Sequence, residues 1–498
     1  MRISFYSGST FLTSSCLAAL LFTGAKPASS QNTIPADAGA TCAVSQSEFE
    51  GWHAGGTNAN PVFAAPDGFG AQFTEPCQFF KWGAQTFLWL TSSAQEDYVF
   101  DQSGFFDVVH DDQGTEKIAK VKVTPNGQGH PNIFALRGVK SDIRGGSGQA
   151  GGGGALVSQK GSLTYYGMHV NDAYVAFRHG MSEDPEAFNF TDAKNTQEFQ
   201  FPSTAEAITQ IVKYGRASGI IDGDGSVAQL AGTLEVKTSW VKADTVDRDA
   251  FVIVTAQVPK FDTSLDTVWA ADGTESIELA MVGMHIAAPV TGHPELAWIT
   301  YEHLSNTPIG AYLYTDTSGA AATYDYNSDG TWTFAKSGAS GQGNMVPNAS
   351  VNAAGDIQAA EGKTVSAQDI VLFNPWGLAP MTANDLANNT DLVSLNASLI
   401  ALLGADENAC DKYFQVGGIW TDGTLPKYQD YDIEVGGLDL ANSTMESFHQ
   451  FGAQKPADFT PRNCFDCHSV SGDNASAPEH NLGVSVSHIF QGMKPYTP

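Results

Sequence analysis

From about residue 105 to 340 the chain repeatedly shows the pattern of β strands. The stretches "AKVKV" (119–123) and "GTLEVKTSW" (232–240) alternate apolar with polar or charged side chains, which is the period of a strand with one buried face. Turn residues separate these stretches from three more continuously apolar ones, which are typical of central strands: "AFVIVTAQV" (250–258), "SIELAMVGMHIAA" (276–288) and "ELAWITYEHL" (295–304). The pattern predicts a mainly β body, built as an antiparallel sandwich or a barrel-like sheet.

Several helices are predicted beside these strands. A segment at about 75–91 is crowded with Phe and Trp, which indicates a buried core helix rather than a cofactor site. The segment 203–215 opens with a capping box of Ser203 and Glu206, and 392–405 has a helical composition. Aromatic residues at 413–420 predict a further strand.

The string "NSTMESFHQF" (442–451) carries a second capping box. Ser443 and Glu446 have the spacing of a helix start, so we expect a short helix there. On such a helix Met445 and His449 lie four residues apart and share one face.

The N-terminus has the organisation of a secretory signal peptide. Arg2 is followed by an apolar run at 17–22 and by small residues at 28–30, which predicts a leader over 1–30 and Gln31 as the first mature residue. Cys16 precedes most of the apolar run, which disfavours a lipoprotein. No later stretch is long and apolar enough to span a bilayer. We expect a periplasmic or extracellular protein without a membrane span.

The chain is strongly acidic, with a formal net charge of −29 at pH 7. Such a surface repels phosphate backbones and anionic lipid, so nucleic acid and membrane surfaces are disfavoured as partners. A solvated acidic surface explains the charge, and docking to a basic partner protein is the alternative.

Three cysteines of the expected mature chain lie outside the C-terminal motif described next. In an oxidising compartment Cys42 and Cys77 are the natural disulfide pair, which leaves Cys410 unpaired. Spacing alone does not choose among the pairings.

The string "NCFDCH" is the strongest chemical signal of the chain. A Cys-x-x-Cys-His motif attaches haem c covalently, because two thiols add across the two vinyl groups and the following histidine then lies beneath the iron. Cys464 and Cys467 would form the thioethers, and His468 would be the proximal iron ligand. A thioredoxin-like redox pair needs a βαβ context and a zinc site needs a second Cys pair, and neither is found in the sequence.

The ligand on the other side of the iron is less constrained. We favour His488, in "VSVSHIFQGM", because the short apolar segment around it could lie over the porphyrin. Met493, His480, Met445, His449 and an open position remain alternatives. A histidine pair would give a lower reduction potential than a His/Met pair.

A second concentration of histidines and carboxylates lies in two predicted strands. It contains His285, His293, Glu295, Glu302 and His303. A hairpin folded about residue 292 would pair position 285 with 299, so these residues do not all converge. Hydrogen-bonded histidines at a sheet edge are favoured over a metal or substrate site, with the alternative that His285 or His303 reaches the haem.

The string "DYNSDGTWT" matches the first half of a calcium loop. Asp325, Asn327 and Asp329 precede Gly330, but Lys336 occupies position twelve, where a bidentate Glu is needed. A turn rich in Asn, Asp and Gly explains the string equally well, so calcium is not the favoured interpretation.

Three strings together resemble a group of exported bacterial mono-haem proteins of the cytochrome c family whose reaction is unassigned: "LEVKTSW", "MVGMHIAAPVTGHPELAWITYEHLSNTP" and "LANSTMESFHQF…NCFDCH…LGVSVSHIF". The resemblance extends from about Cys77 to the end of the chain. It implies that Cys464, Cys467 and His468 bear haem, and it adds no catalytic residue.

The expected organisation has three parts. After a signal peptide at 1–30 comes a β-rich body at 31–440, and the haem c attachment segment at 441–498 is too short to be stable alone, so we expect it to pack on the body. We expect one haem and electron transfer with a redox partner protein. A haem enzyme of peroxidase type, with its small-molecule or polymer substrate bound by the body, is the alternative. Hydrolase and nucleotide-binding motifs are not found in the sequence.

Overall fold

One long strand, β9 (Val268–Val290), organises the β structure. In the computed structural model β8 (Ile253–Asp262) pairs with the first half of β9, while β7 (Glu235–Lys242) and β10 (His293–His303) flank its second half. All three pairings are antiparallel. The first half of β9 is largely exposed and the second half is buried, which follows the change from polar to apolar residues along the strand.

The structure describes these residues: 34–57, 60–70, 72–93, 98–110, 116–120, 132–133, 154–341, 346–352, 354–373, 383–404, 408–450, 463–470, 482–492, 494 and 496. The predicted signal peptide at 1–30 and positions 121–123 of one predicted strand lie outside them. Within the described part, no helix is both long enough and apolar enough to cross a bilayer.

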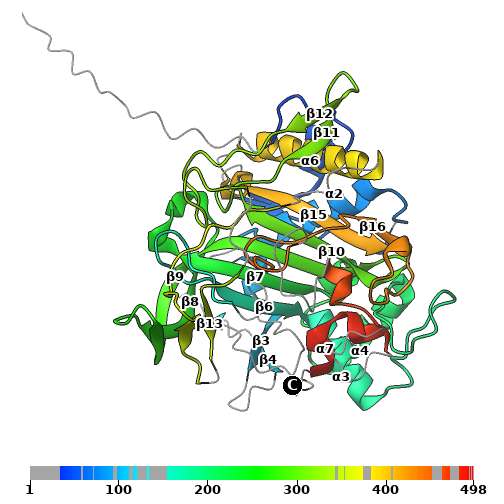
Figure 1. Cartoon of the computed structure of the whole chain (residues 1–498). Coiled ribbons are helices and arrows are strands. Elements are labelled where there is room, and N and C mark those ends of the chain that lie inside the picture. The colour runs from blue at the N-terminus through cyan, green and yellow to red at the C-terminus, as the bar shows by residue number, and fades with distance from the viewer. Residues whose placement is uncertain are drawn as a thin grey trace, which may run out of the picture. The chain divides into compact units, whose positions relative to one another are not determined.

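Most of the described strands form one large, mainly antiparallel sheet with helices around it, in which the short β5–β8 pairing is parallel (Figure 1). Its main path runs β16-β15-β10-β9-β7-β6-β3-β4, and β8, β5, β14 and β13 extend it beside the first half of β9. Among the described residues, the path ends at β16 and β4 and does not close into a barrel. The remaining strands of this sheet are β3 (Phe105–His110), β4 (Glu116–Lys120), β5 (Asn132–Ile133), β6 (Tyr165–Asn171), β13 (Ala349–Val351), β14 (Ile357–Ala359), β15 (Tyr413–Thr421) and β16 (Glu434–Gly436).

Two small hairpins and the helices complete the described elements. The hairpins are β1 (His53–Thr57) with β2 (Asn60–Phe63), and β11 (Tyr312–Thr315) with β12 (Ala321–Tyr324). The α-helices are α1 (Gln46–Gly51), α2 (Pro76–Leu90), α3 (Asp172–Glu183), α4 (Ala205–Ala217), α5 (Ser226–Ala231), α6 (Ala383–Gly404) and α7 (His488–Gly492). The protein is therefore mainly β with several helices, as predicted.

The predicted core helix at 75–91 is confirmed as α2. Its aromatic side chains pack on the sheet: Phe79 stacks on Trp420 of β15 and Phe87 stacks on Tyr301 of β10, with ring centroids 4.1 and 4.0 Å apart. Gly83 lets the helix approach closely, because a Cβ there would lie 2.8 Å from the side chain of Ile299. The Phe and Trp residues thus build the core, as expected.

Both predicted capping boxes differ from the observed helix starts. The helix at 203–215 is confirmed as α4, but its N-cap is Thr204, whose hydroxyl accepts the Ala207 N–H. The short helix predicted for 442–451 is wrong, since residues 442–450 form a series of turns. The Ser443 hydroxyl donates to Glu302 instead of capping a helix. The helix at 392–405 and the strand at 413–420 are confirmed as parts of α6 and β15.

The single disulfide among the described residues joins Cys42 and Cys77, with Cα atoms 5.6 Å apart. It confirms the predicted pair. Cys410 is buried and its thiol lies 3.4 Å from the Thr91 hydroxyl, so it remains a thiol in the core.

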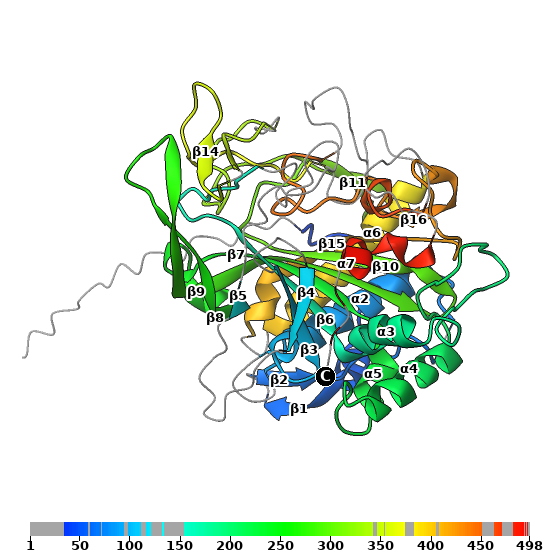
Figure 2. The same cartoon turned by 90° about the horizontal axis from the view of Figure 1, so that it is seen from below.

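The two faces of the sheet are covered differently. Figure 2 shows α2, α3, α4 and α5 on one side of the sheet and β11 on the other. Alternation along β10 directs Tyr301 toward α2 and sends Trp298, Thr300 and Glu302 to the opposite face. Residues after Leu440 pack on that opposite face, and they belong to the same compact unit as the sheet.

The prediction that β7 is only half-buried is wrong. Glu235 and Ser239 on its polar side are 7% and 0% exposed, as buried as the apolar Val236. Their partners explain the difference, because Glu235 accepts from the Ser487 hydroxyl and Ser239 bonds to Thr444. The polar side of this strand is therefore an internal surface that receives the C-terminal part of the chain.

Candidate functional site

The Cys-x-x-Cys-His motif forms one tight turn. Cys464–Asp466 is a 3-10 helix, and the N–H groups of Cys467 and His468 both donate to the Cys464 carbonyl, at 3.1 and 2.8 Å. Cys464 and Cys467 each keep a thiol. The local sequence favours this turn, because the Asn463 side chain accepts the Phe465 N–H at its start. The two thiols and the histidine are thus held within five residues.

Buried polar groups anchor this turn to the sheet edge. The Asn463 amide donates to Glu434, the first residue of β16, at 2.7 Å and to the Leu438 carbonyl at 2.9 Å. The Tyr431 hydroxyl donates to the carboxylate of Asp466, with oxygens 3.1 and 3.2 Å away. Asp466 is 1% exposed, so the turn is fixed from both sides.

His468 has the surroundings of a metal-binding histidine. Its Nδ1 lies 2.8 Å from the Val486 carbonyl, so the proton sits on Nδ1. No described residue hydrogen-bonds Nε2, which leaves that lone pair for a ligand bond. The ring packs against Trp298 of β10, with centroids 4.2 Å apart. The motif turn, His468 and the sheet therefore form one site.

His488 lies beside His468, but its ring nitrogen is engaged elsewhere. The two rings stack with centroids 4.1 Å apart and planes 18° from parallel. His488 Nε2 donates to the Cys467 carbonyl at 2.8 Å. Two histidines that bind one iron from opposite sides each direct a ring nitrogen at it, and stacked rings do not. His488 would have to release Cys467 to serve as distal ligand, so that role stays a prediction.

The other distal candidates fall into two groups. His480 and Met493 lie outside the described residues. Met445 is buried in a small apolar cluster with Tyr166 and Val241, and His449 lies in the same series of turns. Their predicted common helix face does not exist, because 442–450 is not helical.

Burial shifts the pKa of two groups of the motif, the Cys464 thiol and the His468 imidazole. It raises the pKa of the Cys464 thiol well above its ordinary value, and the charges of Glu446 and Cys467 add to this, while Lys237 opposes it. Burial, with the neighbouring His488, lowers the pKa of His468 well below its ordinary value. Glu446 and Lys237 are therefore electrostatic neighbours of the motif.

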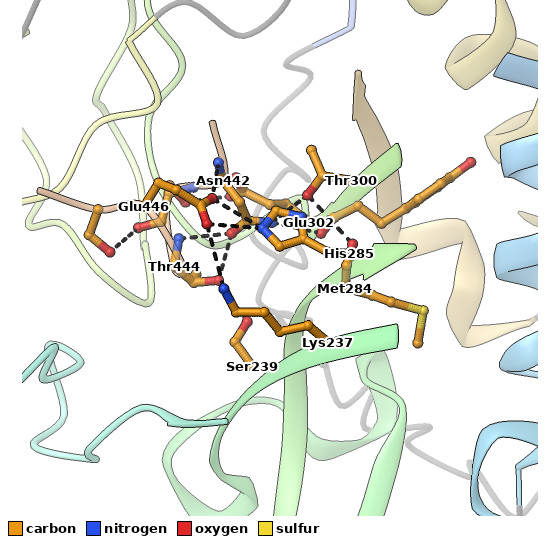
Figure 3. A network of polar contacts seen from close by, with 12 residues as sticks. Lys237, Ser239, Met284, His285, Thr300, Glu302, Asn442, Thr444 and Glu446 are labelled. Carbon is orange, nitrogen blue, oxygen red and sulfur yellow. Dashed lines mark hydrogen bonds and ion pairs between the residues drawn. The ribbon is translucent and has the colours of Figure 1, made fainter. Parts of the chain in front are cut away.

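A polar network that the sequence did not predict adjoins the motif (Figure 3). Figure 3 shows Glu446 between His285 and Lys237, with His285 Nε2 3.1 Å from both carboxylate oxygens and the Lys237 ammonium 3.7 Å from one of them. The Asn442 N–H also donates to this carboxylate, at 2.9 Å. Burial alone would raise the pKa of Glu446, but the positive charges of His285 and Lys237 and these hydrogen bonds outweigh it and lower the pKa to about 2.

Glu302 is the second carboxyl of this network and has neutral partners. It is 1% exposed and accepts from the Ser443 N–H at 2.6 Å, from the Ser443 hydroxyl, and from the Asn306 amide at 3.2 Å. Burial raises its pKa to about 7, although these hydrogen bonds oppose the shift. The two carboxyls thus differ widely in pKa because only Glu446 has cationic partners.

The register of the strands arranges this face in three rows, which we call the docking face. The first row is Glu302, Gly283, Ser239 and Tyr166; the middle row is Thr300, His285, Lys237 and Met168; the third row is Trp298, Ala287, Glu235 and Val170. Ser443 and Thr444 bond to the first row, the Asn442 amide donates to Thr300 of the middle row, and His468 and Ser487 contact the third row. The C-terminal part of the chain therefore lies on both sides of the middle row.

The histidine and carboxylate cluster predicted from sequence is separated by the fold. His285 pairs with Thr300 rather than with position 299, because the β9–β10 register shifts between His293 and Ala297, where Leu296 has a φ of +71°. His285 and Glu302 face the C-terminal segment. His293 pairs with Glu295 at 2.8 Å.

His303 lies apart from these residues, stacked on Phe251 and hydrogen-bonded to the Ala250 carbonyl at 3.0 Å. Burial lowers its pKa to about 3, so it is a neutral core histidine. The predicted hydrogen-bonded role is confirmed for these histidines, but β9 and β10 are central strands, so the predicted sheet-edge location is wrong.

The calcium-like string holds some of its polar groups in local contacts. The Asn327 side chain accepts the Asp329 N–H, and Lys336 forms an ion pair with Asp369 at 2.9 Å. Within the described residues, no group of three or more His, Cys, Asp and Glu could hold a metal ion. A haem iron needs only one or two side chains, since the porphyrin supplies the other ligands.

Comparison with known proteins gives no relative for this chain. No protein family model, no curated protein and no solved structure matches it.

Sequence reasoning found the motif but not the network beside it. The one sequence feature that belongs to this network is the charged side of β7, where Glu235 and Lys237 alternate with apolar residues. In the structure both sides of this strand are largely buried. The pattern of one strand does not reveal that a segment two hundred residues later covers its polar side.

Proposed function

We propose that this protein is an exported c-type cytochrome that carries one covalently bound haem c and transfers electrons. Its haem attachment segment would be 441–498, with thioether bonds at Cys464 and Cys467 and His468 as proximal iron ligand. The resemblance to mono-haem cytochrome c family proteins, the predicted signal peptide and the acidic surface agree with a periplasmic or extracellular role and a redox partner protein.

The observation that carries the proposal is the orientation of His468. Metal-binding histidines usually donate their second ring N–H to a carbonyl or carboxylate, and His468 donates Nδ1–H to Val486. Together with two thiols in the same turn, this matches the donor set that haem c requires. The residues present therefore fit the group.

Bound haem would supply a one-electron carrier, and the chain's own residues would set its surroundings. The Val486 carbonyl fixes the tautomer of His468, and Trp298 covers the ring on the sheet side. Tyr431, Glu434 and the Asn463 side chain hold the turn rigid, which suits electron transfer because little has to reorganise. We further propose that the β-rich body is sandwich-like, because both faces of β7 are covered.

A haem enzyme is the second candidate, and one observation favours it. The Nε2 atom of His488 donates to the Cys467 carbonyl, so a protein ligand on the distal side is not secured. An exchangeable position there would let a small molecule reach the iron.

An absorption spectrum of the ferrous protein, with and without carbon monoxide, tests the two candidates. Electron transfer with both axial positions filled by protein predicts a six-coordinate spectrum that carbon monoxide leaves unchanged. Ready binding of carbon monoxide to the wild-type protein would favour the enzyme and contradict the filled distal position.

The His488→Ala variant assigns the distal ligand. If His488 occupies that position, the variant binds carbon monoxide while the wild-type protein does not. An unchanged spectrum in the variant removes His488 from the iron. The matched control is His303→Gln, in a core histidine whose ring stacks on Phe251 away from the motif.

A further inference from the structure

Ser487 occupies the centre of a tripeptide whose two outer residues both bond to the Cys-x-x-Cys-His turn. Before it, the Val486 carbonyl accepts the Nδ1 proton of His468, at 2.8 Å. After it, His488 donates Nε2–H to the Cys467 carbonyl, also at 2.8 Å. Ser487 itself is 0% exposed. The place of this one residue therefore fixes both contacts of the tripeptide with the motif turn.

The hydroxyl of Ser487 is held by two residues of the β-rich body. It lies 2.7 Å from the hydroxyl of Tyr174 in α3 and 2.7 Å from a carboxyl oxygen of Glu235 in β7. A serine hydroxyl has a single proton, and Ser487 donates it to Glu235, so Tyr174 donates to Ser487. All three residues are buried, so this chain of hydrogen bonds lies inside the protein.

The two body residues are connected to each other through Asn171, the N-cap of α3. The side-chain oxygen of Asn171 accepts the backbone N–H of Tyr174 and that of Leu234, both at 3.0 Å. Leu234 directly precedes Glu235 in the chain. The start of α3 and the start of β7 therefore form one support, and Ser487 is bonded to both parts of it.

Further contacts from α3 hold the residues that follow Ser487. Tyr174, Phe177 and Arg178 lie three and four residues apart, so they share one face of the helix. Phe490 of α7 packs on this face, with its ring centroid 5.3 Å from that of Tyr174 and 5.1 Å from that of Phe177. The Arg178 side chain donates Nε–H to the Phe490 carbonyl at 2.9 Å. The apolar contacts bring α7 to the body, and the hydrogen bonds, which depend on direction, determine its position.

We propose that Tyr174 and Glu235 are positioning residues of the haem site. Through Ser487 they hold the Val486 carbonyl where it orients the ring of His468. This inference rests on the proposed function and gives two residues of the body a role in it. A histidine that donates its second ring N–H to a carbonyl is a more basic ligand. Such a ligand favours ferric over ferrous iron, so the position of this carbonyl helps to set the reduction potential.

The test compares Tyr174→Phe and Ser487→Ala with the wild-type holoprotein. Each variant removes a hydroxyl of the chain, so the hydrogen bond from His468 to the Val486 carbonyl weakens and the midpoint potential rises. NMR of the low-spin ferrous protein gives a second measure. The Nδ1 proton of His468 should exchange with solvent about five- to tenfold faster, which is the effect of one hydrogen bond. The double variant should shift the potential no further than Ser487→Ala alone, because Tyr174 acts through Ser487.

Glu235 is tested by two substitutions at one position. Glu235→Gln keeps a carbonyl oxygen that accepts from the Ser487 hydroxyl, whereas Glu235→Leu removes the acceptor. Neither side chain can be charged, so the difference between the two variants isolates the hydrogen bond. We expect the Nδ1 proton of His468 to exchange faster in Glu235→Leu than in Glu235→Gln, and the potential to be higher. Equal exchange rates and equal potentials in the two variants would remove Glu235 from the positioning role.

The matched control is Tyr214→Phe in the neighbouring helix α4. The Tyr214 hydroxyl lies 2.6 Å from His179 Nδ1, so this variant also removes a tyrosine hydroxyl from a hydrogen bond but leaves Ser487 unchanged. If Tyr174→Phe and Ser487→Ala give the potential and exchange rate of this control, the positioning role is wrong while the proposed function stands. The covalent haem content stays the same in all variants, because attachment uses Cys464 and Cys467. A wild-type protein without covalent haem would overturn the proposed function itself, and the positioning role with it.

Discussion

Two carboxyl groups, Glu302 on the docking face and Glu446 in the turns packed against it, show how partners set the charge state of an acid. Glu446 faces His285 and Lys237 and stays ionised, with its pKa lowered to about 2. Glu302 faces only Ser443 and Asn306, with Glu446 as its nearest charged neighbour, and burial raises its pKa to about 7. Neither role was visible in the sequence, since Ser443 is 141 residues from Glu302, and His285 is 161 residues from Glu446.

The buried Glu302 makes a pH dependence of stability the expected result. Between about pH 4.5, its ordinary pKa, and pH 7 the unfolded chain loses this proton before the folded protein does, so rising pH favours unfolding. The loss amounts to about 3 kcal/mol across that window. Glu302→Gln keeps one acceptor oxygen for the Ser443 N–H and does not titrate, so its stability should fall less from pH 5 to pH 7.5.

Denaturant unfolding of both proteins at the two pH values measures this difference. Glu275→Gln is the control, because Glu275 lies at the surface and pairs with Lys242. Equal pH slopes for wild type and Glu302→Gln would show that Glu302 is ionised in the folded protein.

At the scale of elements, close contact between the sheet and the C-terminal turns depends on Gly283 of β9. A Cβ at this position would lie 2.7 Å from the Ser239 hydroxyl, 2.8 Å from that of Thr444 and 3.1 Å from the Asn442 amide. The strand pattern predicted β9 and its neighbours correctly, because apolar continuity marks a buried strand. It could not predict that a glycine there makes room for a segment far along the chain.

We expect Gly283→Ala to weaken the docking of residues 442–446. The overpacked contact should cost about 1–3 kcal/mol and should expose the C-terminal segment to proteases earlier than the rest of the chain. Gly51→Ala is the control, since nothing lies within 4 Å of a Cβ added at that helix end. Thermal unfolding and limited proteolysis measure both effects. Equal stability and equal cleavage of the two variants would contradict close packing at Gly283.

At the scale of the whole molecule, one polar face of the large sheet contacts the turn that carries the Cys-x-x-Cys-His motif. Periodicity predicted the mainly β character and the core helix, because these follow from local pattern. The disulfide between Cys42 and Cys77 was the expected pair, but the sequence alone left the other pairings open. The tertiary placement of Cys464–His468 against Trp298 of β10 could not be predicted, since it depends on pairing between remote segments. The sheet therefore supplies the surface against which His468 and the motif turn pack.

The most direct test of this account is whether the mature protein holds haem covalently. The full chain, with the expected signal peptide at 1–30, would be produced in a bacterium that matures c-type cytochromes, denatured, and extracted with acidified acetone. The account predicts that the haem spectrum stays with the polypeptide of the wild-type protein and is lost from the Cys464→Ser, Cys467→Ser double variant. Haem that moves into the acetone, or a wild-type protein without haem, would contradict it.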